Sequence, residues 1–215
     1  MKNQRRKHPL AILKTALALP ETNATTERNT EGKEGKNIDI ELPNKKYNII
    51  YADPPWHYEK RNEGKRNVST HYETMSFEDI YKLPVKNITA QDSILFLWVT
   101  YPKLLEGLKT IESWGFIYKT CGFSWIKMNK KSNTPFMGMG NWTRANNEIC
   151  ILATKGKPKR ISASVRQVVH SKIEEHSKKP SCIRDGIVEL VGDLPRIELF
   201  ARETAEGWDS WGNEL

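Results

Sequence analysis

Apolar residues beyond residue 46 fall into short segments that carry two different periods. Continuous apolar runs, which are typical of buried strands, predict strands over residues 47–52, 93–100, 116–127, 148–154 and 196–201. Apolar residues with helical spacing predict helices over residues 77–83, 102–114 and 180–190. Strands and helices therefore alternate along the chain, which predicts an α/β fold with a mostly parallel sheet.

Residues 1–45 follow a different pattern. The leucines within residues 10–17 have a helical spacing, whereas residues 21–37 are polar and show no apolar period. We therefore predict a basic, flexible N-terminal arm and linker over residues 1–45, and one folded domain over residues 46–215. The basic start of the arm resembles a secretory signal, but Lys14 interrupts its apolar stretch and no convincing cleavage site follows, which favours a cytoplasmic protein.

Composition narrows the classes of function. No run of about 18 apolar residues is present, so we expect neither a transmembrane helix nor a membrane partner. The three cysteines are widely separated and form no CxxC pair, which argues against a disulfide framework and a zinc site. The net charge of +8 and the pI near 9.3 favour a polyanionic partner such as nucleic acid, although many basic proteins bind no polyanion.

The segment Asp53-Pro54-Pro55-Trp56 directly follows the first predicted strand, at the end of a strand where ligands of such sheets bind. A simple turn is the ordinary interpretation of Asp and Pro. Two consecutive prolines also fix two φ angles and remove two N–H donors, so we expect nearby carbonyls to lack strand partners. A carboxylate beside a bare carbonyl makes a pair of acceptors that suits an amino group. Trp56 offers a flat face on which an aromatic base can stack.

This acceptor pair has a chemical use. The exocyclic amine of adenine is a poor nucleophile because its lone pair is delocalised into the ring. Two acceptors on its hydrogens localise the lone pair on nitrogen, which can then attack a sulfonium methyl group in line. Positioning and electrostatics supply much of the rate, so the reaction needs neither a metal nor a covalent enzyme intermediate.

Further sequence blocks accompany ADPPW in a fixed order. They are HYETMS at 71–76, LFLWVT at 95–100, WGF at 114–116, GNWTRANNE at 140–148, HSKKP at 176–180, RIELFAR at 196–202 and WGNE at 211–214. With these blocks the chain resembles the MT-A70 family of S-adenosylmethionine-dependent adenine N(6)-methyltransferases, in its small bacterial and phage form. The resemblance implies a Rossmann-like methyltransferase fold, with a mostly parallel sheet covered by helices on both faces, and S-adenosylmethionine as methyl donor.

The resemblance also implies roles for individual residues. The catalytic motif falls on Asp53, Pro54, Pro55 and Trp56. Contacts to the methyl donor fall on Asp53, Lys179, Phe200, Arg202, Asn213 and Glu214. Contacts to the acceptor base fall on Tyr58, Tyr72, Trp142, Glu148 and Lys179. No residue is implied as a metal ligand.

Several of these residues have an ordinary interpretation as well. Lys179 alone would be a lysine at a helix start, Phe200 a core residue of a strand, and Trp142 a packing residue of a loop. We expect a structural role for Glu198. The chain also departs from the eukaryotic members of the family, which carry a histidine and an asparagine after the arginine of RIELFAR and an amide at the position of Glu214.

The polymer that carries the adenine is the most open question. Three basic clusters are expected near one edge of the sheet, where they would contact phosphates, although each alone is typical of a solvated surface. They are Lys60, Arg61, Lys65 and Arg66; Lys127, Lys130 and Lys131; and Lys155, Lys157, Lys159 and Arg160. The bacterial form favours DNA over RNA. RNA as acceptor, and a non-catalytic nucleic-acid-binding subunit, remain alternatives, and a homodimer or heterodimer is left open.

Overall fold

The computed structural model describes residues 41–57, 74–140, 142–174, 177–213 and 215. The expected arm falls almost entirely on residues outside this set, so its boundary at residue 46 stays a prediction. Within the described part of the chain, no helix is long and apolar enough to cross a membrane.

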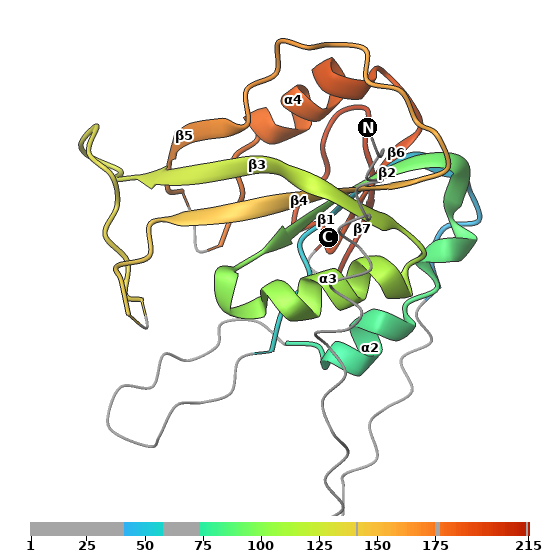
Figure 1. The fold of residues 1–215 in the computed structure, drawn as a ribbon, viewed down its shortest axis with the longest axis horizontal. Helices are drawn as coiled ribbons and strands as arrows, with labels where there is room; N and C mark the ends of the chain where they lie inside the picture. The colour runs from blue at the N-terminus through green and yellow to red at the C-terminus, as the bar shows by residue number, and fades with distance from the viewer. Residues whose placement is uncertain (1–40, 58–73, 141, 175–176, 214) are drawn as a thin grey trace, which may run out of the picture. The chain divides into compact units, whose positions relative to one another are not determined.

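The described chain forms one seven-stranded sheet in the order β5-β3-β4-β2-β1-β6-β7 (Figure 1). Its strands are β1 Tyr47–Ala52, β2 Thr89–Val99, β3 Ile117–Met128, β4 Asn147–Lys155, β5 Val168–Lys172, β6 Arg196–Leu199 and β7 Asp209–Trp211. Strand β4 is antiparallel to β2 and β3, and the remaining neighbours are parallel. The predicted α/β class with a mostly parallel sheet is confirmed.

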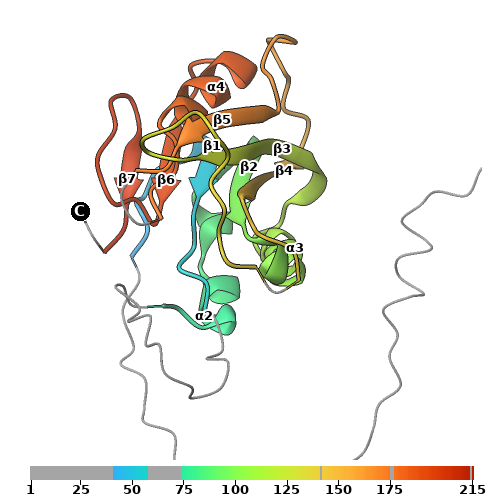
Figure 2. The same cartoon turned by 90° about the vertical axis from the view of Figure 1, so that its left-hand side faces the viewer.

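The helices cover both faces of this sheet (Figure 2). They are α2 Phe77–Lys82, α3 Leu104–Ser113 and α4 Cys182–Val191, with short 3-10 turns η1 Val85–Asn87 and η2 Tyr101–Lys103. Side chains alternate across the sheet, so Ile50 lies in the core beneath α2 and α3, whereas Ile49 lies in the core beneath α4. This alternation explains the continuous apolar runs, since both faces of the central strands are buried.

Local signals set the ends of the helices. Ser76 caps α2 by accepting a hydrogen bond from the Asp79 backbone N–H at 3.1 Å. At the end of α3, Gly115 adopts a left-handed φ of 82°, and the buried Trp114 donates its indole N–H to the Ile80 carbonyl at 2.8 Å. That bond joins α3 to α2. The helix predicted over 102–114 begins two residues later than expected, because the turn that carries Pro102 is 3-10.

Strands β5 and β7 were not predicted, and their positions explain why. Both lie at the edges of the sheet, where one side has no neighbouring strand. No residue of either strand is fully buried, so neither strand carries an apolar run. The apolar pattern therefore identified the central strands and missed the edges.

The core beneath α4 makes a testable contribution to stability. Replacing Ile187, whose side chain is 0% exposed, with alanine is expected to lower the free energy of unfolding by about 2–5 kcal/mol, because a cavity remains. The matched control is Leu105→Ala on α3, at a side chain that is 74% exposed, which should change it by less than about 0.5 kcal/mol. Equal losses in urea unfolding would contradict the assigned packing.

Candidate active site

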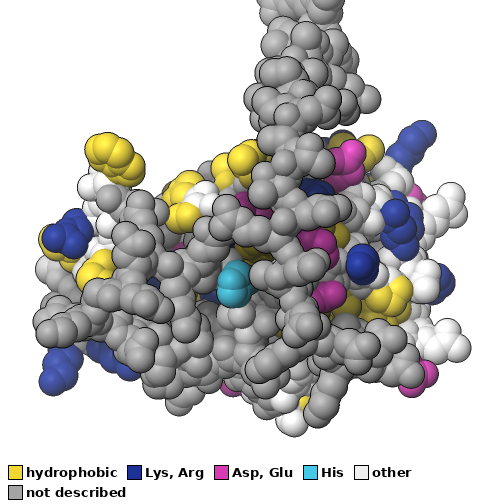
Figure 3. Space-filling view, turned by 90° about the horizontal axis from the view of Figure 1, so that it is seen from below, with side chains coloured by type: hydrophobic (Ala, Val, Ile, Leu, Met, Phe, Trp, Pro, Cys, Tyr) yellow, Lys and Arg dark blue, Asp and Glu magenta, His cyan; other side chains and the backbone are white. Residues whose placement is uncertain are grey.

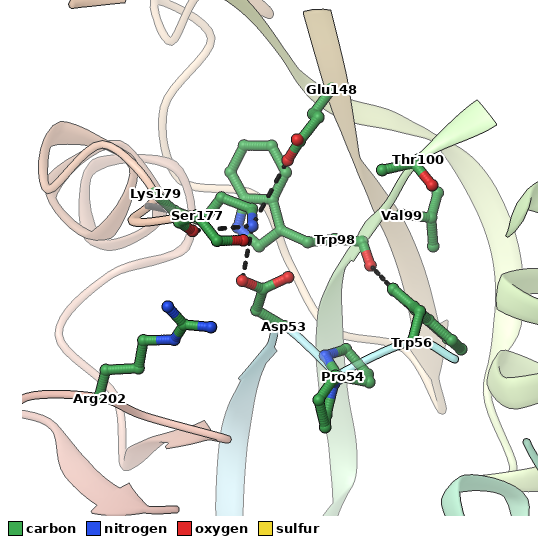
Figure 4. A pocket seen from close by; sticks show the side chains of 11 residues that line it. Asp53, Pro54, Trp56, Trp98, Val99, Thr100, Glu148, Ser177, Lys179 and Arg202 are labelled. Atoms are coloured by element: carbon green, nitrogen blue, oxygen red, sulfur yellow. Dashed lines mark hydrogen bonds and ion pairs between the residues drawn. The ribbon is translucent and has the colours of Figure 1, made fainter. Parts of the chain in front are cut away.

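A pocket opens at the carboxyl ends of the parallel strands β1, β2 and β6 (Figure 4). The segment after β1 supplies the DPPW residues, and Arg202 follows β6. Glu148 reaches the same edge because β4 runs antiparallel to β2 and begins there. The pocket is lined by Asp53, Pro54, Pro55, Trp56, Trp98, Val99, Thr100, Glu148, Ser177, Lys179 and Arg202.

Alternating charges cross the pocket in a row. Lys179 Nζ lies 2.6 Å from Asp53 Oδ2 and 3.4 Å from Glu148 Oε2. The other oxygen of Glu148, Oε1, accepts a hydrogen bond from Lys127 Nζ at 2.5 Å. The Lys179 side chain is only 11% exposed, so the ion pairs are shielded from solvent more than surface pairs are. Each carboxylate in the row is therefore held in place by at least one ammonium group.

These contacts set the protonation of the row. Burial raises the pKa of the Asp53 carboxyl, although the Lys179 ammonium acts in the opposite direction. Burial also acts to raise the pKa of Glu148, but Lys179 and Lys127 together lower it below its ordinary value. Burial acts to lower the pKa of Lys179, yet Asp53 and Glu148 raise it above its ordinary value. Lys179 is thus charged at neutral pH, and Asp53 accepts a proton more readily than Glu148.

The backbone is strained at Ser177, which lines the pocket, and at Phe200, two residues before the pocket residue Arg202. Ser177 has a φ of 66° and Phe200 a φ of 63°, and among the described residues these are the non-glycine positions with positive φ. Ser177 places its carbonyl 3.3 Å from Lys179 Nζ and accepts a hydrogen bond from it. The ammonium also lies 5.5 Å from the centre of the Trp98 ring. Such strain persists where the surroundings enforce a particular geometry, as at many functional sites.

The two prolines behave differently from the prediction. Pro54 O accepts a hydrogen bond from the Trp56 backbone N–H at 2.8 Å, and Pro55 O accepts one from the Met75 N–H at 3.0 Å. The expectation of bare carbonyls was therefore wrong, because the backbone N–H groups of Trp56 and Met75 supply donors to these two oxygens. A carbonyl oxygen has two lone pairs, so Pro54 O can still accept a second hydrogen bond.

Trp56 also differs from the prediction. Its side chain is 5% exposed, lies beside Phe77 in the core, and donates its indole N–H to the Trp98 carbonyl at 3.1 Å. The expected stacking face for a base is wrong, because the ring is buried. Trp56 instead ties the DPPW turn to the end of β2.

Comparison with known proteins places this pocket in a family. A family model described as MT-A70 matches residues 47–214, which contain every residue that lines the pocket. The chain belongs to the MT-A70 family. The predicted resemblance and the predicted class of enzyme, a methyltransferase, are thereby confirmed.

Three relatives show how far the similarity extends. The type II methyltransferase M.MunI of Mycoplasma is 37% identical over 90% of this chain and 88% of its own length. An N6-methyladenosine RNA methyltransferase of Pyricularia oryzae is 29% identical over 79% of this chain and 47% of its own length. An N(6)-adenosine-methyltransferase MT-A70-like protein of Arabidopsis thaliana is 27% identical over 79% of this chain and 24% of its own length.

Within this MT-A70 domain, the structure brings some of the expected site residues together and leaves others apart. Asp53, Glu148, Lys179 and Arg202 come from distant parts of the sequence and meet at the pocket. Residues that do not line it are Phe200, which packs edge-on against Trp211 at 5.5 Å, Asn213, which is exposed, and Trp142, which is exposed in the β3–β4 loop. Tyr58, Tyr72 and Glu214 lie outside the described residues.

Sequence reasoning missed several residues of the site. The pocket is also lined by Trp98, Val99, Thr100 and Ser177. Outside its lining, Lys127 donates a hydrogen bond to Glu148. The first three could have been found as the carboxyl end of the most apolar strand, which is where ligands bind in such sheets. Glu198 accepts a hydrogen bond from Arg184 at 2.7 Å and does not line the pocket, which agrees with the structural role expected for it.

The basic clusters do not lie at the same ends of the strands. Lys127 lies near the end of β3 on the pocket side, whereas Lys155 pairs with Ser93 at the opposite ends of the strands, away from the pocket. The Lys157 backbone N–H donates to Asp92 Oδ1 at 2.7 Å on that same far side. The expectation was wrong for the cluster at 155–160, because β4 is antiparallel and carries its carboxyl end away from the pocket. The cluster at 60–66 lies outside the described residues.

The charge of Glu148 has a consequence for stability. Its replacement by glutamine is expected to lower the free energy of unfolding at neutral pH by about 1–3 kcal/mol, because Lys127 and Lys179 lose a charged acceptor. The folded pKa of Glu148 is lowered, so its stabilising effect is present above the unfolded pKa of about 4.3 and is lost as the pH falls through the folded pKa. Urea unfolding should show the two proteins converging in acid.

The control for this change is Glu206→Gln, at an exposed position, which should alter stability by less than about 0.5 kcal/mol. A stability gap for Glu148→Gln that stays constant as the pH is lowered would contradict the ion-pair role of Glu148.

Proposed function

We propose that this protein transfers a methyl group from S-adenosylmethionine to the exocyclic amine of adenine in DNA. The observation that carries the proposal is the Asp53 carboxylate, fixed by Lys179 at 2.6 Å at the mouth of the turn that carries Pro54. The names of the Pyricularia and Arabidopsis relatives specify methylation of adenosine at N6, which supports adenine as the base.

Asp53 and Pro54 can hold the amine between them. Lys179 engages Asp53 Oδ2, and a carboxylate retains acceptor capacity at its second oxygen, Oδ1. Pro54 O offers the second acceptor through its remaining lone pair. With one amine hydrogen on each acceptor, the nitrogen lone pair is drawn out of conjugation with the ring and directed at the methyl carbon.

The pocket suits a positively charged donor. S-adenosylmethionine, when bound, supplies a methyl group on a cationic sulfonium. Asp53 and Glu148 present negative charge at the pocket, while Lys179 and Arg202 present positive charge that can meet a donor carboxylate. We assign the donor contacts to Asp53, Lys179 and Arg202, and we keep Phe200, Asn213 and Glu214 as expected contacts.

The transfer balances as one substitution and one deprotonation. A nitrogen–carbon bond forms, the sulfur–carbon bond breaks, and its electron pair stays on sulfur. The amine then has one proton too many. Asp53 is the nearest group able to take it, because burial raises its pKa and makes it a better acceptor than an exposed carboxylate.

DNA is the favoured polymer because the similarity to the type II methyltransferase covers nearly all of both chains. In the RNA methyltransferase of Pyricularia oryzae the matched part covers 47% of that protein.

The cysteines Cys121, Cys150 and Cys182 are unpaired, which supports the cytoplasmic location we predict. A non-catalytic subunit is disfavoured, because such subunits have lost the acidic and aromatic residues of the motif and this chain keeps both Asp53 and Trp56.

Competition between polymers tests the assignment. The protein is incubated with methyl-labelled S-adenosylmethionine and equal amounts of adenine-containing DNA and RNA of the same sequence. We expect label in the DNA, with N6-methyladenine as the modified nucleoside by mass spectrometry. Label in RNA alone would overturn the choice of DNA while leaving the chemistry intact, and absence of label in both would support the non-catalytic alternative.

A further inference from the structure

The loop between β3 and β4, residues 129–146, projects past the ends of both strands (Figure 1). Its two arms are hydrogen-bonded to each other near the base, where the Lys127 backbone N–H donates to Asn146 O at 2.8 Å. Further out, the Gly138 N–H donates to Ala145 O at 2.9 Å. The described part of the loop therefore contains two segments. Residues 129–135 form a turn of their own, closed where the Phe136 N–H donates to Lys127 O at 2.7 Å, and the segment beyond Phe136 leads back into β4, which carries the pocket residue Glu148.

Two glycines bring the arms together at the tip. A Cβ atom at Gly138 would lie 2.5 Å from Ala145 O, and one at Gly140 would lie 1.8 Å from Thr143 O. Neither approach is possible for a residue with a side chain. Trp142, whose side chain is 100% exposed, lies next to this close approach in the chain, and Met137 and Met139 of the same loop are also exposed. Isolated exposed apolar side chains are ordinary on a protein surface, but three large ones within six residues of one loop favour a binding surface.

The charge of the loop indicates which kind of partner it binds. The loop contains Lys130, Lys131 and Arg144 and no aspartate or glutamate. On the left of Figure 3, where Figure 1 places this loop, hydrophobic and basic side chains lie together. Lysine is depleted in the cores of protein interfaces, whereas surfaces that bind nucleic acid combine cationic groups with aromatic rings that stack on bases.

The loop is also close enough to the pocket to act on the same substrate molecule. Trp142 precedes the pocket residue Glu148 by six positions in the chain, which limits their separation to about 20 Å. One turn of duplex spans about 34 Å. A base in contact with Trp142 would therefore lie within about one helical turn of the adenine in the pocket.

We propose that the β3–β4 loop is a nucleic-acid clamp in which Trp142 stacks on a base near the target adenine. Lys130, Lys131 and Arg144 contact the neighbouring phosphates. This inference rests on the proposed function, because it assigns the surface that holds the same substrate.

Binding measured without a methyl donor separates this inference from the proposed function. The probe is a fluorescein-labelled DNA duplex of about 20 base pairs, followed by anisotropy with the full chain. Trp142→Ala is expected to weaken binding about 5-fold to 100-fold, the range for loss of one stacked base, while Trp142→Tyr recovers most of it. The control Ile117→Ala removes an exposed apolar side chain at the opposite edge of the sheet and should leave binding unchanged.

The role of the lysines and the arginine is tested by the dependence of DNA affinity on salt concentration. A Lys130→Ala, Lys131→Ala and Arg144→Ala triple variant should reduce the slope of log affinity against log salt by about 2–3, one phosphate for each cation. Unchanged affinity in Trp142→Ala would overturn the clamp, even if the wild-type protein methylates DNA. Loss of a dimer in Trp142→Ala by sedimentation, with DNA affinity retained, would show a protein interface and would also overturn it. If the wild type transfers no methyl group but Trp142→Ala still weakens binding, the clamp stands and the proposed function fails.

Discussion

Replacing Asp53 with alanine will lower the rate of methyl transfer by about 10²–10³-fold, the loss found when one preorganised polar group of a transition state is removed. The reason is that the amine loses its carboxylate acceptor and the group that takes its proton. Single-turnover transfer to DNA, with saturating S-adenosylmethionine, measures the change. Binding of the donor, followed by calorimetry, should weaken by less than about tenfold, because Lys179 and Arg202 also contribute to the pocket.

The controls separate chemistry from folding. Asp53→Asn keeps an oxygen acceptor and should retain more activity than the alanine variant, although it cannot take the proton. Asp92→Ala removes a carboxylate at the opposite edge of the sheet, where it accepts a hydrogen bond from the Lys157 backbone, and should leave the rate unchanged. Wild-type turnover in Asp53→Ala, with an unchanged thermal midpoint, would refute the role of Asp53.

Replacing Lys179 with methionine will have the second-largest effect, and it acts on stability as well as on rate. The change leaves Asp53 without its ion-pair partner in a pocket that is largely shielded from water, which should lower the free energy of unfolding by about 3–5 kcal/mol at neutral pH. The loss should shrink in acid. The reason is that protonation of Asp53, whose pKa is already raised, removes the unpaired charge.

Lys178→Met is the matched control for this variant. Lys178 is the neighbouring residue and pairs with Glu203 at 3.0 Å at a more exposed position, so its loss should change stability by at most about 1 kcal/mol. Equal destabilisation by both changes, or a loss at Lys179 that does not depend on pH, would contradict the buried ion pair.

The sequence predicted the central part of the fold because buried strands and helices have a recognisable pattern of apolar residues. Strands β1 and β2 are buried on both faces and so appear as unbroken apolar runs, and the helices that cover them keep a helical period. Edge strand β5 and the three-residue strand β7 are only partly buried and have no such pattern. The direction of β4 was equally inaccessible, because an apolar run has the same appearance in either orientation.

Only those site residues that lie at a predictable place along the chain could be found from the sequence. Asp53 could be found because it directly follows a strand, and the rule for ligand positions in α/β sheets applies to it. Its pairing with Lys179, which lies 126 residues further along the chain, depends on how β1 and the segment before α4 meet in space. The reversed strand β4 brings Glu148 to the same place and carries the basic cluster at 155–160 away from it.

The central claim is that the pocket around Asp53 methylates the exocyclic amine of adenine. The most direct measurement is the nucleoside composition of DNA after incubation with labelled S-adenosylmethionine, determined by mass spectrometry for the wild type and for Asp53→Ala side by side. The account predicts labelled N6-methyladenine with the wild type and, at equal and short incubation times, about 10²–10³-fold less with the variant. Equal amounts of N6-methyladenine from both proteins, or label on a different base, would contradict it.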